Sequence, residues 1–110
     1  GAHGEHNFRA RPGHHLPPQD LSSGRNIFEK LGEGFTLLAF DGAPETVASF
    51  KRAADNLNIP LKIISDTYAD RRTEYHARII LIRPDQYVAW TGDASPGDPV
   101  AIMKKAVGQG

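Results

Sequence analysis

Apolar and polar positions along the first half of the chain predict strands and helices in alternation. A continuous apolar run over 35–40 predicts a strand buried on both faces. Residues 44–57 begin with proline and carry apolar side chains at helical spacing, which predicts a helix. Residues 61–65 predict a second strand. This strand–helix–strand order favours a right-handed crossover and parallel pairing of the two strands.

The second half of the chain predicts a β-hairpin and a closing helix. Two apolar segments, 77–82 and 87–90, flank Arg83-Pro-Asp-Gln86, and proline at the second position of such a segment favours a tight turn. Residues 98–107 predict a helix that an aspartate caps and a proline begins. The polar segment 67–75 predicts one irregular helical turn.

The amino-terminal segment differs in composition from the rest. Residues 1–24 hold four of the five histidines and few apolar side chains, which predicts an extended arm, either disordered or draped over a surface. Residues 25–110 are expected to form one folded domain, because the chain is long enough for one core and too short for two. Within it, Asn26 suits the cap of a short helix over 27–31, and Gly32 suits the left-handed residue that ends it.

The order of elements predicts an α/β fold of the thioredoxin type, with a mixed central sheet flanked by helices. A reactive cysteine pair would follow the first strand in such a fold, because a helix start lowers a thiol pKa. That place reads Asp41-Gly-Ala-Pro-Glu45, and the chain has no cysteine. Dithiol exchange is therefore excluded, and a fold of this type without its thiols is typical of a binding or structural module.

Charge and hydropathy exclude further classes of protein. Thirteen Lys and Arg balance thirteen Asp and Glu, so the chain has no overall attraction to nucleic acid or to an anionic membrane. No apolar run reaches the roughly 18 residues of a membrane helix, and no signal peptide is visible, so we expect a cytoplasmic protein. The only methionine is Met103, which favours a piece of a longer protein, with Gly1-Ala2 as a scar of cleavage.

The spacing of the histidines and arginines favours neither a metal site nor an anion site. No two histidines have the i, i+4 spacing that aligns metal ligands on one helix face, so a metal site is disfavoured. Four arginines in the second half alternate with carboxylates, which favours a solvated, salt-bridged surface over an anion site. They are Arg71, Arg72, Arg78 and Arg83.

Two aromatic residues, Tyr75 and Trp90, are candidates for a functional role. Trp90 at the end of a predicted strand is expected in the core or in an interface. A small enzyme that uses Tyr75, His76 and nearby carboxylates is a less favoured alternative, and it requires a cleft with a perturbed pKa. No glycine-rich phosphate loop and no G-x-S-x-G elbow is present.

Three strings of residues together resemble a known family. They read Arg11-Pro-Gly-His-His-Leu-Pro17, Arg25-Asn-Ile-Phe-Glu-Lys-Leu-Gly-Glu-Gly-Phe-Thr-Leu-Leu38 and Ile80-Leu-Ile-Arg-Pro-Asp-Gln-Tyr-Val-Ala-Trp90. This combination resembles the C-terminal thioredoxin-like domain of FAD-dependent aromatic hydroxylases, the phenol hydroxylase and polyketide hydroxylase group of flavin monooxygenases. The resemblance covers residues 12–108, and the hairpin string is its most specific part.

Residue by residue, the resemblance marks ten interface or structural candidates. In the arm, His15 and Pro18 depart from the arginine and histidine that are usual in the family. Asp85 is expected to close the hairpin turn by accepting backbone N–H bonds, whereas Arg83 either supports the turn or reaches a carboxylate across a domain interface. The ten candidates are Pro12, Gly13, Pro17, Gly32, Gly34, Phe35, Arg83, Pro84, Asp85 and Trp90.

The resemblance implies a division of labour within a longer monooxygenase that hydroxylates an aromatic compound. FAD, NAD(P)H and the substrate would be bound by preceding domains of the same chain, and this domain would supply packing and homodimer contacts. It implies no catalytic, cofactor-binding or metal-binding residue in the present chain. The rival interpretation is a free-standing, redox-inactive thioredoxin-like module that binds a protein, and the length of the native reading frame distinguishes the two.

Overall fold

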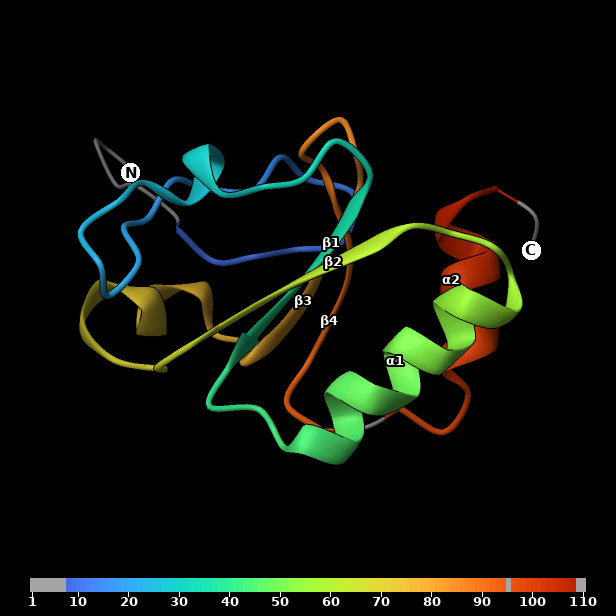
Figure 1. Cartoon of the computed structure of the whole chain (residues 1–110). Helices are drawn as coiled ribbons and strands as arrows, with labels where there is room; N and C mark the ends of the chain where they lie inside the picture. Colours follow the sequence, from blue (N-terminus) through green and yellow to red (C-terminus); the bar gives the residue numbers. More distant parts are fainter. Residues whose placement is uncertain (1–7, 95, 109–110) are drawn as a thin grey trace.

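A computed structural model describes residues 8–94 and 96–108, and its centre is a four-stranded mixed sheet (Figure 1). The strands, in the order β2-β1-β3-β4, are β1 (Phe35–Phe40), β2 (Leu61–Asp66), β3 (Ile79–Ile82) and β4 (Val88–Gly92). β1 and β2 are parallel, whereas β3 pairs antiparallel with both β1 and β4. The mixed sheet predicted from the element order is confirmed. The expected cleavage scar, Gly1-Ala2, lies outside the described residues.

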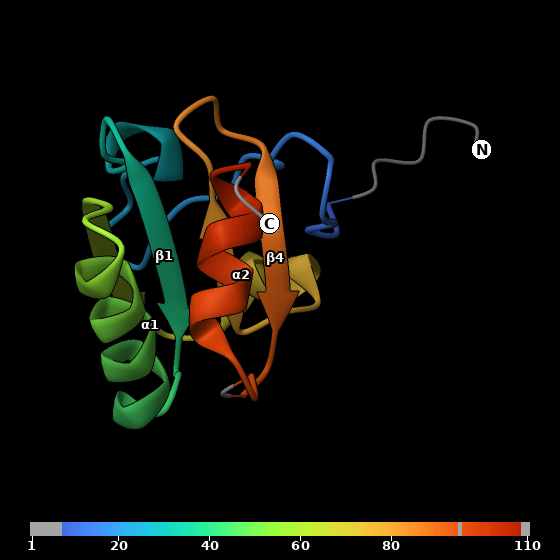
Figure 2. The same ribbon diagram turned by 90° about the vertical axis from the view of Figure 1, so that its right-hand side faces the viewer.

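Both α-helices cover the same face of this sheet (Figure 2). They are α1 (Pro44–Asn56) and α2 (Pro99–Ala106), and each begins with the predicted proline, which presets helical φ where no N–H is needed. Asp98 caps α2 by accepting a hydrogen bond of 3.1 Å from the N–H of Ala101. The buried cluster under the helices consists of Leu37, Ala39, Phe50, Ala53, Ala54, Ile79, Leu81 and Met103.

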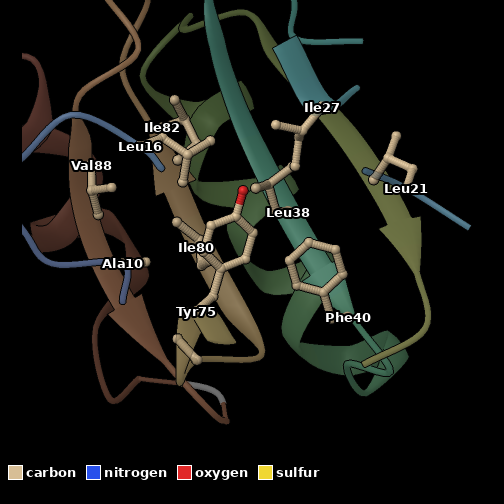
Figure 3. Close-up of a cluster of buried hydrophobic side chains, with 11 residues drawn as sticks. Ala10, Leu16, Leu21, Ile27, Leu38, Phe40, Tyr75, Ile80, Ile82 and Val88 are labelled. Carbon is tan, nitrogen blue, oxygen red and sulfur yellow. The ribbon is translucent and has the colours of Figure 1, made fainter. Parts of the chain in front are cut away.

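The arm, here residues 8–24, covers the opposite face together with two 3₁₀ turns (Figure 3). These turns are η1 (Ile27–Glu29) and η2 (Asp70–Tyr75). Of the two states expected for the arm, the draped one describes these residues, because their apolar side chains enter the core. The second buried cluster consists of Ala10, Leu16, Leu21, Ile27, Leu38, Phe40, Tyr75, Ala77, Ile80, Ile82 and Val88.

Like β3, β1 contributes buried side chains to both clusters. Because successive side chains of a strand point to opposite faces, Leu37 and Ala39 pack beneath the helices, while Leu38 and Phe40 pack beneath the arm. β1 also has a hydrogen-bonded neighbour on each side. The predicted burial of this strand on both faces is therefore confirmed.

Three local predictions differ from the structure. The helix expected over 27–31 is a single 3₁₀ turn that ends at Glu29, although its predicted cap, Asn26, is present. Gly32 does not have left-handed backbone, because the turn has already ended, and its N–H donates to Thr36 Oγ1 at 3.1 Å. The last strand continues beyond Trp90, so this residue lies inside β4 rather than at its end.

Candidate functional site

The loop between β1 and α1, where a thioredoxin carries its cysteines, is a packed turn in this chain. Asp41 has left-handed backbone with φ 52°, and its carboxylate accepts a hydrogen bond of 2.9 Å from the N–H of Tyr68. A Cβ added to Gly42 would lie 2.6 Å from Cδ1 of the buried Ile79, so the loop lies directly on the sheet. Asp41 and Gly42 thus hold this loop in place, and the loop contains no thiol.

Tyr75 and His76, the pair considered for a small enzyme, face different surroundings. The Tyr75 hydroxyl is buried and donates a hydrogen bond of 2.6 Å to the carbonyl oxygen of Pro17. Desolvation raises the pKa of Tyr75 well above its ordinary value, so the phenol stays neutral across the physiological range. His76 is exposed and has left-handed backbone with φ 56° at the end of η2. Tyr75 therefore fastens the arm to η2.

Arg72 is a second fastening point, and its position corrects the prediction of a solvated arginine. Only 3% of Arg72 is exposed. Its Nε and Nη2 donate hydrogen bonds of 2.7 Å to the carbonyl oxygen and the hydroxyl of Thr67, and Nη1 donates one of 3.2 Å to the carbonyl oxygen of Asp20. The Asp66 carboxylate lies 3.7 Å from Nε. Arg72 thus joins the end of β2 to the arm.

Asp66 completes this buried polar cluster at the arm. Its carboxylate accepts hydrogen bonds of 2.8 Å from the N–H groups of Ser22 and Thr67. Desolvation raises the pKa of Asp66, but the hydrogen bonds from Ser22 and Thr67 and the charge of Arg72 outweigh it, so the pKa lies below its ordinary value. The carboxylate is held in its charged form as part of the arm's attachment.

A more exposed polar contact lies beside this cluster. The side-chain amide of the buried Gln19 donates a hydrogen bond of 2.9 Å to Oε1 of Glu74. Nε of Arg71 donates a second one, of 3.2 Å, to the same carboxylate oxygen. The hydrogen bond from Gln19, reinforced by Arg71, lowers the pKa of Glu74. The Arg71 guanidinium also lies 5.6 Å from the centre of the Phe8 ring. The arm is thus attached to η2 over most of its described length.

At its other side, the arm pairs with β4 like a short extra strand. The N–H of Gly13 donates a hydrogen bond of 2.8 Å to the carbonyl oxygen of Val88. In return, the N–H of Val88 donates a hydrogen bond of 2.8 Å to the carbonyl oxygen of His14. The N–H of Leu16 donates 2.9 Å to the carbonyl oxygen of Gln86. This pairing occupies part of the free edge of β4 and fixes the arm next to the hairpin.

The hairpin turn has the predicted chemistry. The N–H of Gln86 donates 2.9 Å to the carbonyl oxygen of Arg83, and Gln86 has left-handed backbone with φ 71°. One oxygen of Asp85 accepts a hydrogen bond from the N–H of Tyr87 at 3.2 Å, as expected for a residue that closes a turn. The other oxygen accepts one from Nη2 of Arg83 at 2.6 Å. Arg83 and Asp85 are both about half exposed, so the pair faces solvent.

Seven of the ten candidate residues line two neighbouring hollows, which we call the hairpin groove. The first hollow, of about 370 Å³, lies between the arm, β4 and α2 and includes Pro12, Gly13, Arg83 and Trp90. The second, of about 590 Å³, lies between the hairpin turn and the end of α2 and includes Phe35, Arg83, Pro84 and Asp85. Arg83, Lys105 and Ala106 line both hollows.

Trp90 is the largest side chain of the hairpin groove. Its ring packs against Phe50 of α1 with a centroid distance of 5.3 Å. Gly92 leaves room for the ring, because a Cβ on Gly92 would overlap the indole of Trp90. The indole thus joins the helix-covered core to the groove, and Trp90 belongs to both environments that the sequence predicted as alternatives.

The three other candidates lie outside the hairpin groove. Pro17 lines a hollow of about 280 Å³ within the arm, with Arg9, Arg11, His14 and His15. A Cβ on Gly32 would lie 3.2 Å from Cδ of Lys62, and one on Gly34 would lie 3.4 Å from the carbonyl oxygen of Pro60. The two glycines therefore allow the segment before β1 to pass close to the start of β2.

Sequence reasoning missed the residues that attach the arm and one wall of the hairpin groove. The buried roles of Arg72 and Gln19 have no sequence signal, because each depends on a partner 52 or 55 residues away. Lys105 lies in the last turn of α2. Its place opposite the hairpin follows from how α2 packs on β4, which the helical pattern alone does not specify.

Residues 8–94 and 96–108 contain neither a metal-binding cluster nor a membrane-spanning helix. Within these ranges no three histidine or carboxylate side chains gather in a way that would hold a metal ion. None of the helices in the same ranges is long and apolar enough to span a bilayer.

Comparison with known sequences supports the family resemblance. Residues 9–109 match the family model described as aromatic-ring hydroxylase, C-terminal. The chain is 36% identical over 104 residues to the FAD-dependent monooxygenase opdD of Penicillium oxalicum, and the match covers 88% of the chain and 20% of that protein. It is 29% identical over 111 residues to 4-methyl-5-nitrocatechol 5-monooxygenase of Burkholderia sp. This match also covers 88% of the chain and 20% of the relative. The chain therefore spans about a fifth of the length of these relatives.

Solved structures agree with the sequence comparison. The rebeccamycin biosynthetic enzyme RebC with reduced flavin superposes with a TM-score of 0.86 and 30% identity, over all of this chain and 21% of RebC. Aklavinone-11 hydroxylase in complex with FAD and aklavinone shares the fold, with a TM-score of 0.62 and 22% identity over 83% of this chain and 19% of its own. With its sheet, its arm and its hairpin string all accounted for, the chain belongs to the family of aromatic-ring hydroxylase C-terminal domains.

Proposed function

We propose that this chain is the C-terminal structural domain of a longer FAD-dependent monooxygenase, which uses NAD(P)H and hydroxylates an aromatic substrate. The observation that carries the proposal is the coverage of the match. The family model spans residues 9–109, yet the same residues correspond to only about a fifth of each relative. In such a protein the other four fifths would bind the flavin, the pyridine nucleotide and the substrate.

The described residues do not fit FAD themselves. A dinucleotide phosphate is usually bound by free N–H groups of a glycine-rich turn at the start of a helix. The corresponding turn here places Pro44, which has no N–H, at the first position of α1 and places the carboxylates of Asp41 and Glu45 on either side. Gly42 lies against Ile79 rather than facing an open cradle. We therefore assign FAD to the preceding domains of the parent.

Packing is the role that the domain's own groups support. Among the described residues, the buried ionisable side chains of Tyr75, Arg72 and Asp66 all bind the arm. The hairpin groove stays open on the outside and gathers seven of the ten candidate residues. We propose that this domain contributes contacts to the preceding domains, and that a homodimer contact is a second use of its surface.

The test is to express the native reading frame that contains these residues. We expect a protein about five times longer than this chain, which retains FAD on purification and oxidises NAD(P)H faster when an aromatic substrate is added. A matched protein that ends before residue 9 of this chain shows whether the domain is needed for stability or for turnover. A reading frame that encodes little beyond these residues would instead favour the free-standing protein-binding module.

A further inference from the structure

We propose that the hairpin groove docks an acidic segment of the polypeptide that precedes this domain in the longer protein, with an apolar side chain of that segment seated against Trp90. The inference rests on the proposed function and adds to it a place and a chemistry for the contact. Three features of the described residues carry it: the charge of the groove, its apolar wall and its position beside the arm.

The charge is uneven although the whole chain is neutral. Two cationic side chains, Arg83 and Lys105, line the hairpin groove, against the single carboxylate of Asp85. A third, Arg11, lines the hollow within the arm and precedes Pro12 of the groove wall. Asp85 is already paired with Arg83. Within the described part of the chain, the side chains of Lys105 and Arg11 have no ion-pair partner. A surface of this kind complements carboxylates, which would steer the partner and fix its register.

The apolar wall gives the contact its anchor. The hollow beside β4 is lined by side chains from three segments, so an apolar group entering it would be surrounded on several sides. Trp90 is half-buried there, and tryptophan beside a cationic rim is a composition typical of the residues that dominate binding energy. The apolar lining consists of Pro12, Val88, Ala89, Trp90, Ile102 and Ala106.

The position of the groove points to a partner in the same polypeptide. Pro12 and Gly13 of the arm form one wall, and the N–H of Gly13 is bonded to the carbonyl oxygen of Val88. The segment that leads into the domain is therefore itself part of the docking surface. Since the relatives extend over about five times the length of this chain, the preceding domains of such a protein are tethered next to this groove at high effective concentration.

The experiment mixes two separately produced polypeptides, the 110-residue chain and the rest of the native reading frame loaded with FAD, and measures their affinity by calorimetry. We expect Lys105→Glu to weaken binding about tenfold or more, since it places a carboxylate where an acidic segment docks. Lys104→Glu is the matched control, because Lys104 is also exposed but does not line the groove, and we expect the affinity of this variant to stay within about twofold of the unmodified chain. Raising the salt concentration should weaken the unmodified pair and reduce the difference between the variants.

Each outcome decides the inference. Arg11→Glu gives a second variant, in the arm next to the groove wall, and circular dichroism of all three variants shows that they are folded. Equal affinities for the Lys105 and Lys104 variants, or no binding to an FAD-loaded partner, would overturn the inference while the proposed function stands. Self-association of the chain alone that Lys105→Glu abolishes would assign the groove to a second copy and overturn it as well. A reading frame whose product binds no FAD would overturn the proposed function and, with it, this inference.

Discussion

The hydroxyl of Tyr75 donates a hydrogen bond of 2.6 Å to the carbonyl oxygen of Pro17, which lies 58 residues earlier in the chain. This contact joins the arm to η2 beneath the sheet face that the helices leave uncovered. Because Tyr75 is fully buried and stacks on Phe40 with a centroid distance of 5.9 Å, the contact belongs to the core rather than to the surface. The arm is thus held by the same residues that form the domain.

Replacing Tyr75 by phenylalanine tests this attachment. Tyr75→Phe leaves the carbonyl of Pro17 without its partner, so we expect the free energy of unfolding to fall by about 1–2 kcal/mol in a urea titration. Tyr68→Phe is the control, because its hydroxyl makes a longer bond, 3.3 Å, in a more exposed place. If the two variants lost equal free energy of unfolding, the buried Tyr75 hydrogen bond would stabilise the chain no more than the exposed one of Tyr68.

Arg71 and Arg72 are neighbours in sequence, but Arg71 is exposed and Arg72 is buried. Arg72→Ala removes three hydrogen bonds and leaves the Asp66 carboxylate without its cation, so we expect a loss of about 3 kcal/mol or more, or a chain that no longer folds. Arg71→Ala removes one exposed ion pair, and we expect a loss below about 1 kcal/mol. Thermal unfolding of the two variants side by side checks this. Similar melting temperatures would contradict the buried role of Arg72.

Asp66 should make the free energy of unfolding of the chain depend on pH. Its pKa is lower in the folded chain than its ordinary value of 3.8, so the unfolded chain binds the proton more readily. The stabilisation is therefore complete above that ordinary value and is lost as the pH falls below it, through the lower folded pKa. Urea unfolding at several pH values checks the sign. Asp66→Asn should lose stability at neutral pH and show a shallower decline in acid than the unmodified chain, and parallel declines would contradict the account.

Gly92 leaves space for the indole that lines the hairpin groove. Gly92→Ala places a Cβ against the rigid ring of Trp90, so the ring must shift, and we expect a loss of about 1–3 kcal/mol. Trp90 is the only tryptophan, so its fluorescence emission reports the shift directly. Gly97→Ala is the control, because its Cβ would meet nothing within 4 Å. An unchanged emission spectrum for Gly92→Ala would contradict the proposed packing.

The sequence predicts well those features that depend on local pattern. The apolar run of β1, the prolines that begin α1 and α2, and the turn closed by Asp85 each follow from residues close together in the chain, and each is confirmed. The family was identified in the same way, from three short strings. Gly32 was assigned wrongly for a local reason, because the helix that it was expected to end is one turn long.

Features that depend on distant partners could not be predicted. Arg72 sits among carboxylates in sequence and was expected at the surface, but the bond to Asp20 appears only once the arm lies across η2. The hairpin groove likewise combines the arm, β4 and α2, whose relative placement no periodicity encodes. Its candidate residues came from the family resemblance, and their meeting on one side of the domain comes from the structure.

The most direct test of the account is a titration of the purified 110-residue chain with FAD, followed by equilibrium dialysis and by flavin fluorescence. If the domain supplies packing and the flavin belongs to the preceding domains, the chain should show no saturable binding up to about 100 μM FAD, while the product of the full reading frame retains the flavin through purification. Saturable, tight binding of FAD to the isolated chain would contradict the account at its centre.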